Sequence, residues 1–261
     1  SQLVQKRYYS SGVTNQFNES VLDFASSGSA ICHQQGSRNQ FNYNYFSLPV
    51  STINTSANNL ASSVSGIMRD GTNCANPLSL QWTGSYNPNP NTSGKTLSNR
   101  WIYAYENYVA NTYAQWRYLG SNGTFNAGLG YTIKGSNSQT HAYQNYAFIG
   151  KPNNAQITTP ITLGNNALIG NPYPSAIDAR EFIKDNIPLL NPDNSVNPNA
   201  NPNTTGSIDG TLYFWIHFDS NNTHILRDYQ GGYATYTLSG GLAPPTGEQY
   251  NTEDNYNISG S

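Results

Sequence analysis

An alternation of aromatic and amide side chains runs through Phe41-Asn42-Tyr43-Asn44-Tyr45. A period of two places successive side chains on opposite faces, which is typical of a β-strand with one buried face. Similar short aromatic and apolar runs predict further strands at residues 101–105, 131–133, 147–149, 211–216 and 233–237. The spacing of these strands and of the turns between them predicts an all-β fold, an antiparallel β-sandwich or a jelly-roll-like arrangement.

The amino-acid composition favours the same fold class. Charged residues make up 10% of the 261 residues, against roughly a quarter in an average soluble domain. The chain contains 20 Tyr and 4 Trp but 1 Met, and its Tyr, Thr, Asn and Gly residues favour strands and turns over helices. Such a chain stays in solution through neutral hydrogen-bonding groups rather than through charge.

Two segments rich in Asn and Pro predict long surface loops, at residues 87–94 and 191–206. Proline has no N–H for a sheet hydrogen bond, and it restricts the residue before it. The chain is expected to form one β-rich domain over residues 1–261, or two closely packed β subdomains with a boundary near residues 85–98. Because Ser1-Gln2-Leu3-Val4-Gln5 resembles the middle of a strand, we interpret the chain as a fragment of a longer one.

One short helix is predicted near residues 175–184. Ser175 is a suitable N-cap, because its hydroxyl can accept a hydrogen bond from the first turn. Ile177, Phe182 and Ile183 recur at a spacing that places them on one buried face. The pattern therefore predicts a single amphipathic helix in a chain of strands.

The charge distribution excludes two classes of partner. The net charge is −2, from 12 basic and 14 acidic residues. No stretch concentrates Lys and Arg, so we expect no nucleic-acid partner. No apolar run approaches the roughly 20 residues of a membrane-spanning helix, so we expect no membrane span.

A search for catalytic motifs finds none. The sequence has no H-E-x-x-H helix and no G-x-S-x-G nucleophile elbow. A polysaccharide hydrolase would need two carboxylates facing each other across a cleft, and the sequence pairs no two of its carboxylates. We therefore expect a protein that binds rather than an enzyme.

Two groups of side chains could bind a metal ion. His217 and His224 flank Asp219 and could meet across a hairpin, although surface and half-buried histidines without a metal are the favoured interpretation. Asp219, Asn221 and Asn222 offer clustered oxygen ligands for calcium, but the segment lacks the Gly and the terminal Glu of an EF-hand loop. Apart from this calcium hypothesis, we expect no cofactor.

The two cysteines are Cys32 and Cys74. In an exported protein a single pair often forms a disulfide, and closing a loop of this size would stabilise the fold by about 3–4 kcal/mol. The alternative is two buried thiols that never meet.

The aromatic residues allow a binding function. Tyr and Trp on a sheet face can stack on sugar rings, and Asn and Gln can bond sugar hydroxyls, so the composition permits carbohydrate binding. The alternative for each ring is that it fills the core.

A longer motif, Leu168-Ile169-Gly170-Asn171-Pro172-Tyr173-Pro174-Ser175-Ala176-Ile177-Asp178, resembles the GNPYPSAID signature of exported surface proteins of Bacteroidota, typically substrates of the type IX secretion system. Further pieces are similar to the same family in order, at residues 43–50, 100–103, 125–135, 148–154, 210–215 and 228–234. The resemblance implies export and display at the outer cell surface or release. It implies no defined activity and no catalytic residues, and it implies that a sorting domain follows in the full-length protein.

The signature also has a physical interpretation. Asn171, Pro172, Tyr173 and Pro174 would form a rigid structural turn, because both prolines restrict the backbone. A binding site at this turn is the alternative.

The function that these observations favour is that of a secreted surface protein, an adhesin that binds glycans, other surface proteins or neighbouring copies of itself. One alternative is a carbohydrate-binding accessory module of a secreted polysaccharide-degrading enzyme. Another is an extracellular filament subunit, a homo-oligomer that grows by β-strand addition.

Overall fold

The computed structural model describes residues 5, 7–9, 17–19, 22–23, 25–89, 91–109, 115–138, 143–202, 206, 208–217 and 221–244. Strands dominate it, and nearly all of them pair antiparallel, so the expected all-β class is confirmed. Within these residues no helix is long and apolar enough to cross a membrane.

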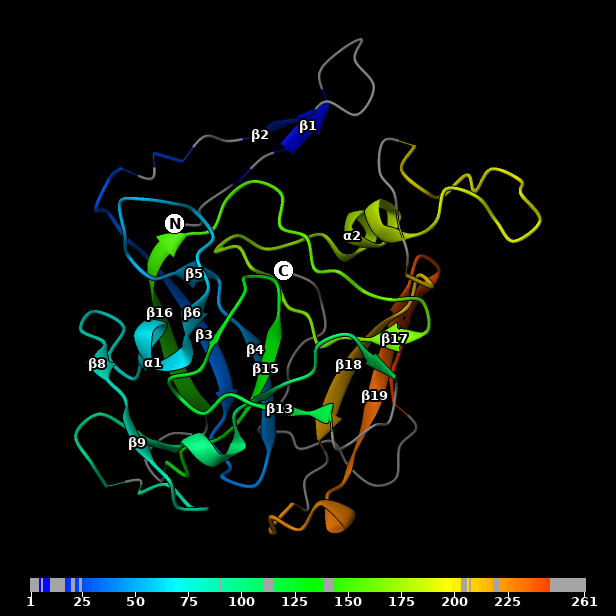
Figure 1. Cartoon of the computed structure of the whole chain (residues 1–261). Helices are drawn as coiled ribbons and strands as arrows, with labels where there is room; N and C mark the ends of the chain where they lie inside the picture. Colours follow the sequence, from blue (N-terminus) through cyan, green and yellow to red (C-terminus); the bar gives the residue numbers. More distant parts are fainter. Residues whose placement is uncertain are drawn as a thin grey trace.

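Two large sheets form the body of the protein (Figure 1). The first sheet contains β3 (Ala30–Ser37), β16 (Tyr143–Pro152), β7 (Met68–Asp70), β8 (Leu78–Ser79) and β5 (Val50–Ser51), which pairs with the end of β16. The second sheet contains β13 (Arg117–Tyr118), β11 (Tyr103–Ala104), β15 (Gly130–Lys134) and β4 (Tyr43–Ser47).

The two sheets share one hydrophobic core. Phe46 of β4 packs its ring 5.7 Å from that of Tyr146 and 6.0 Å from that of Phe148, both on β16 of the first sheet. Tyr131 and Ile133 of β15 point into the same core and are fully buried. Burying each such side chain stabilises the fold by roughly 1.5–3 kcal/mol. Period-two alternation then directs the residues between them to the outward face of the second sheet.

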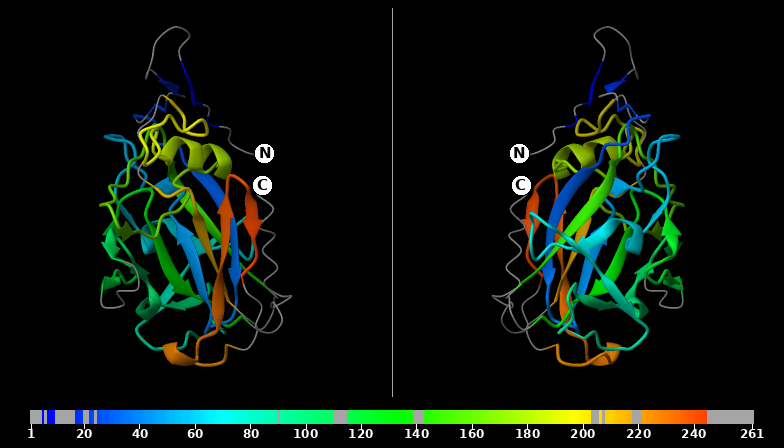
Figure 2. Two further views of the ribbon diagram at one scale, coloured as in Figure 1. Left: turned by 90° about the vertical axis from the view of Figure 1, so that its right-hand side faces the viewer. Right: turned by 90° about the vertical axis from the view of Figure 1, so that its left-hand side faces the viewer.

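A third sheet follows later in the chain. It contains β18 (Leu212–His217), β19 (Gly231–Thr237) and β20 (Gly240–Leu242), paired antiparallel in this order. The helix α2 (Ala179–Asn186) covers one end of it, and the 3-10 helix η3 (Leu226–Asp228) lies at the opposite end, as Figures 1 and 2 show. A second, smaller core of Ile183, Ile187 and Ala200 joins α2 to this sheet.

The remaining elements are short. They are β1 (Arg7–Tyr9) with β2 (Phe17–Glu19), β6 (Ser62–Ser63) with β14 (Thr124–Phe125), β9 (Gln81–Thr83) with β10 (Thr96–Ser98), β12 (Tyr108–Val109) with β17 (Asn165–Asn166), α1 (Val64–Ile67) and the 3-10 helix η1 (Asn99–Trp101). The pair β9–β10 is parallel, an exception to the expected antiparallel pattern.

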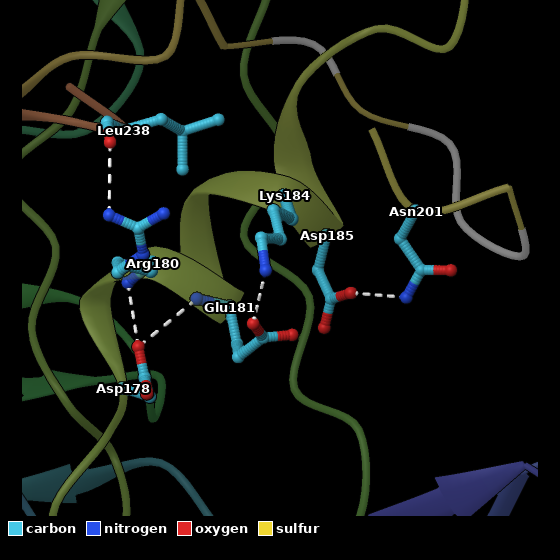
Figure 3. Close-up of polar contacts among 7 residues, drawn as sticks. All are labelled: Asp178, Arg180, Glu181, Lys184, Asp185, Asn201 and Leu238. Carbon is cyan, nitrogen blue, oxygen red and sulfur yellow. Dashed lines mark hydrogen bonds and ion pairs between the residues drawn. The ribbon is translucent and has the colours of Figure 1, made fainter. Parts of the chain in front are cut away.

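The predicted helix is displaced toward the C-terminus. It begins at Ala179 rather than near Ser175, because the Asp178 carboxylate accepts hydrogen bonds from the N–H groups of Arg180 (2.8 Å) and Glu181 (3.2 Å) (Figure 3). Asp178 is therefore the cap. Ile177 precedes the helix and is 46% exposed, so the prediction that it shares the buried face was wrong.

The segment near residues 85–98 does not separate two cores. Leu80 and Leu97, before and near the end of it, belong to the same large core, and β9 pairs with β10 across it. The second core begins only with α2. Within the described residues, the change from one core to the other therefore lies between β17 and α2.

Candidate functional site

The outward face of the second sheet carries a row of aromatic and polar side chains. Tyr43 lies opposite Lys134, and Tyr45 lies opposite Thr132. Tyr103 of β11 lies opposite Thr132 on its other side. Because cross-strand partners share one face of a sheet, these side chains form a continuous surface.

Lys134 is enclosed by rings at one end of this row. Its ammonium nitrogen Nζ lies 4.2 Å from the ring centroid of Trp101, 4.4 Å from that of Tyr43 and 5.8 Å from that of Tyr229. It also lies 3.2 Å from Nδ1 of His224, whose ring stacks on Trp101 at 4.7 Å. Lys134 is only 2% exposed. The ammonium group is thus held by cation–π attraction inside an aromatic cage formed by the chain itself.

Burial sets the electrostatics of this cage. Desolvation lowers the pKa of Lys134 to about 8, because the low-dielectric surroundings disfavour its charged form. Desolvation, and then the positive charge of Lys134, lower the pKa of His224 to about 4. Near neutral pH the ammonium group therefore donates to Nδ1 of a neutral imidazole. The imidazole proton then lies on Nε2, which donates to Oδ1 of Asn87 at 2.7 Å.

The loop before β19 closes over the second sheet. The backbone N–H of Tyr43 donates to the hydroxyl of Tyr229 at 2.9 Å. Asn221 is buried, and its amide donates to Oδ1 of Asn42 and to the carbonyl oxygen of Gln230. These bonds attach residues 221–230 to the start of β4 and position the third sheet.

Trp215 links the cage to the third sheet. Its ring stacks on that of Tyr229, with centroids 6.0 Å apart and planes inclined by 20°. It also meets the ring of Tyr233 edge-on at 4.9 Å. Trp215 and Tyr233 are cross-strand partners, so the stack continues along one face of β18 and β19.

This stack ends at the protein surface. Tyr213 is 59% exposed and Tyr233 is 53% exposed, and their rings lie 6.1 Å apart at 86°. We call Tyr213, Trp215 and Tyr233 the aromatic surface. Leu242 extends it, because Leu242 and Tyr213 both lie opposite Thr235. Exposed rings supported from below by other rings are rigid, and their faces and edges can pack against the apolar face of a ligand.

The signature segment forms a turn held by side chains. Oδ1 of Asn171 accepts from the N–H of Tyr173 at 3.0 Å, and the Asn171 amide donates to the carbonyl oxygen of Ser175 at 2.6 Å. The carbonyl oxygen of Pro172 accepts from the buried amide of Asn153 at 2.8 Å. In the structure, these residues thus join the first sheet to the segment that leads into α2.

The candidate metal ligands that the structure describes lie apart from one another or make other contacts. Asp219 lies outside the described residues, Asn222 is exposed, and the amide of Asn221 serves the loop contacts above. His224 lies in the cage, whereas His217 is buried at the end of β18. In the described part of the chain, no three His, Cys, Asp or Glu side chains gather in a way that could hold a metal ion.

Cys32 and Cys74 are both free thiols, so the expected disulfide is not formed in the structure. Cys32 of β3 and Met68 of β7 both lie opposite Phe148 of β16. The strand β16 therefore separates β3 from β7 by about 10 Å, the spacing of two strand steps. Cys74 lies beyond the end of β7 and is exposed, and a disulfide requires Cα atoms within roughly 7 Å.

Comparison with known proteins places part of the chain in a family. A model described as "Domain of unknown function (DUF8693)" matches residues 85–258, about two thirds of the 261 residues. The chain belongs to the DUF8693 family. The matched DUF8693 region includes Trp101, Lys134 and the aromatic surface, but not Tyr43. No curated protein and no solved structure matches the chain significantly.

Sequence reasoning did not find the cage. Its members come from β4, η1, β15 and the loop before β19, so no local motif contains them. One signal was present in Gly130-Tyr131-Thr132-Ile133-Lys134, where a lysine continues an otherwise uncharged strand on its outward face. A lysine at such a position must either reach solvent or have partners for its charge, and here its partners are aromatic rings.

Proposed function

We propose that this protein is an extracellular adhesive protein that binds glycans through the aromatic surface. The observation that carries the proposal is the pair of exposed, adjacent rings of Tyr213 and Tyr233 on one face of the third sheet. The Tyr233 ring is half exposed yet packs against Trp215 and Tyr213, so it loses little conformational entropy when a ligand binds. The chain has only 10% charged residues and a net charge of −2, which favours a neutral partner rather than a nucleic acid.

The test is a glycan-array screen of the whole chain, followed by calorimetry with the best ligand. The double variant Tyr213→Ala/Tyr233→Ala should lower the affinity about 5- to 150-fold, because each lost ring contact costs about 0.5–1.5 kcal/mol. Tyr213→Phe and Tyr233→Phe keep the rings and should retain most of the binding.

Tyr143→Ala is the matched control. Tyr143 is a half-buried tyrosine of β16, which belongs to the first sheet rather than the third. Its replacement should leave glycan binding unchanged. Equal affinity of the double alanine variant and the wild type would refute the proposal, as would the absence of any glycan ligand.

We also propose that the protein is exported and acts at the outer surface of a Bacteroidota cell, as a substrate of the type IX secretion system. The ordered resemblance around Gly170-Asn171-Pro172-Tyr173-Pro174 supports this proposal. Immunolabelling of intact source cells tests it. Labelling should depend on a functional type IX system. Retention of the protein inside intact wild-type cells would exclude the proposed export.

Self-association by strand addition is a second candidate function. The strand β3 spans eight residues, Ala30–Ser37, without a Pro, Asp, Glu, Lys or Arg. It lies at an edge of the first sheet, and no described strand pairs with its outer side. Natural proteins usually protect such an edge with charges, prolines or bulges, since it can pair with another chain. The edge of β3 is therefore suited to pairing with a second copy.

Sedimentation analysis over a range of concentrations tests this second function. Ile31 of β3 is 52% exposed, and Ile31→Lys places a charge on the edge strand. This variant should stay monomeric where the wild type associates. Ile53→Lys replaces an isoleucine of similar exposure (47%) outside any strand and should associate like the wild type. A wild type that stays monomeric at high concentration excludes strand addition.

A further inference from the structure

A groove separate from the aromatic surface lies beside α2. It has a volume of about 440 Å³. Three segments form its walls. The first is the C-terminal half of α2 with the loop after it, the second is residues 208–211 directly before β18, and the third is residues 237–239 at the turn between β19 and β20. A volume of this size is in the range of small-ligand sites.

Hydrogen bonds to α2 hold two of the walls in place (Figure 3). The guanidinium group of Arg180 donates to the carbonyl oxygen of Leu238 at 3.0 Å, which fixes the turn after β19. The amide of Asn201 donates to the Asp185 carboxylate, and its backbone N–H donates to the carbonyl oxygen of Lys184 at 3.0 Å. These bonds anchor the end of the loop that follows α2.

The loop wall and the strand wall are also ordered. The backbone N–H of Asn197 donates to the carbonyl oxygen of Leu189 at 2.7 Å, and Leu190 bridges to Val196 across the loop. The N–H of Ile208 donates to the carbonyl oxygen of Asn186 at 3.0 Å. The groove is thus preformed, which lowers the entropic cost of binding a ligand.

The lining has one apolar side and a neutral polar rim. Ile183 and Ile187 of α2 are buried beneath it, and Leu190 is 51% exposed. The rim carries the amides and hydroxyls of Asn191, Asn197, Asn199, Thr211, Thr237 and Ser239. Among the described residues that line the groove, no side chain is aromatic and Asp209 is the single ionisable group. Its carboxylate already accepts from the N–H of Thr211 at 2.8 Å.

This chemistry selects a class of ligand. A rim of amides and hydroxyls with the single carboxylate of Asp209 suits a ligand without negative charge that carries several hydroxyl groups. An aliphatic floor offers no ring for flat stacking, but it buries a methyl group well and leaves a hydroxyl in the same position without a partner. We propose that the groove binds a 6-deoxyhexose, a sugar that carries a methyl group in place of the hydroxymethyl group, as part of a neutral glycan.

Paired sugars test the proposal on the whole ¹⁵N-labelled chain by amide NMR titration. L-fucose differs from L-galactose, and L-rhamnose from L-mannose, only by the absence of the oxygen at C6. At least one deoxy sugar should bind about fivefold or more tightly than its hydroxylated partner, because a buried hydroxyl without a partner costs about 1–3 kcal/mol. The shifted signals should belong to residues that line the groove, such as Ile208 and Thr211.

Two exposed residues of the loop after α2 provide the test variant and its matched control. Leu190→Asn removes an apolar contact from the groove and should weaken binding of the deoxy sugar at least about fourfold. Val196 is 68% exposed, lies opposite Leu190 and does not line the groove, so Val196→Asn should bind like the wild type. Because both side chains are exposed, neither change should unfold the protein.

The outcome is independent of the proposed function of the aromatic surface. The variant Tyr213→Ala/Tyr233→Ala should bind the deoxy sugar as the wild type does. Equal affinities within both sugar pairs, absence of binding at tens of millimolar sugar, or unchanged binding by Leu190→Asn would each overturn the proposal.

Discussion

Replacing Lys134 with methionine should change how the stability of the fold depends on pH. Methionine keeps most of the length and apolar volume of the side chain but carries no charge. At neutral pH two effects oppose each other. The variant avoids burying an ammonium group, and it loses the cation–π attraction to Trp101 and Tyr43, about 1–2 kcal/mol for each ring. A comparison of stability at one pH therefore measures only the sum of the two effects, whereas the pH dependence of stability reports on the buried ammonium group.

The magnitude follows from the pKa of Lys134. The pKa is about 8 in the folded protein and 10.5 in the unfolded chain. Between these values the unfolded chain holds a proton that the folded protein has released, so the free energy of unfolding rises with pH. From pH 7 to pH 9.5 the wild type should gain about 2 kcal/mol relative to Lys134→Met.

Tyrosines do not obscure this difference. Burial raises the pKa of Tyr45, Tyr131 and Tyr233, so the folded protein keeps these phenol protons at a pH where the unfolded chain loses them. This lowers the stability of both proteins alike above about pH 10. The difference between the two proteins below pH 9.5 therefore reports on Lys134.

The assay is urea-induced unfolding followed by tryptophan fluorescence at several values between pH 7 and 9.5. Tyr43→Phe is the matched control, since it keeps a ring over the ammonium group and should retain the rise with pH. Parallel pH profiles of the wild type and Lys134→Met would show that the ammonium group is not buried in the cage, and would refute the reasoning.

Three further predictions concern single groups. The pKa of His224 is lowered to about 4, so the free energy of unfolding should fall as the pH drops from 6.5 to 4. The variant His224→Gln should reduce this fall in acid unfolding curves, and an unchanged fall would contradict the prediction. Asp178→Ala should lower the free energy of unfolding by about 1 kcal/mol through loss of the N-cap of α2, whereas Ser175→Ala should have a smaller effect in the same urea assay. Mass spectrometry of the unreduced protein should find two free thiols, and a disulfide-linked peptide would contradict the structure. Exposed Cys74 should be alkylated faster than Cys32, because burial raises the pKa of the Cys32 thiol.

Much of the fold could be predicted because strand patterns are local. The run Phe41-Asn42-Tyr43-Asn44-Tyr45 leads into β4, and the predicted strand at residues 233–237 lies within β19. The prediction at residues 175–184 found a helix but not its first residue. Ser175 and Asp178 are both good caps, and the choice between them depends on the Asn171 amide, which binds the Ser175 carbonyl oxygen.

The candidate site could not be predicted in the same way. Residues 212–216, Leu-Tyr-Phe-Trp-Ile, form a continuous apolar run, which is typical of a strand buried on both faces. The structure instead leaves Tyr213 59% and Phe214 41% exposed, because the third sheet lies at the outside of the molecule. Exposure depends on what packs against a strand, and the strand's own residues do not specify its neighbours.

The sequence by itself determines that this chain forms strands and turns. The alternation of aromatic and amide residues, the scarcity of charge and the Asn-Pro loops are sufficient, because the side-chain period of a strand and the backbone restriction by proline both act over a few residues. The tertiary structure alone decides that Tyr43, Trp101, Lys134 and Tyr229 meet in one cage, and that Tyr213 and Tyr233 reach the surface. These contacts join segments up to about 190 residues apart in the chain, and they are selected by the burial of the whole core rather than by any local preference.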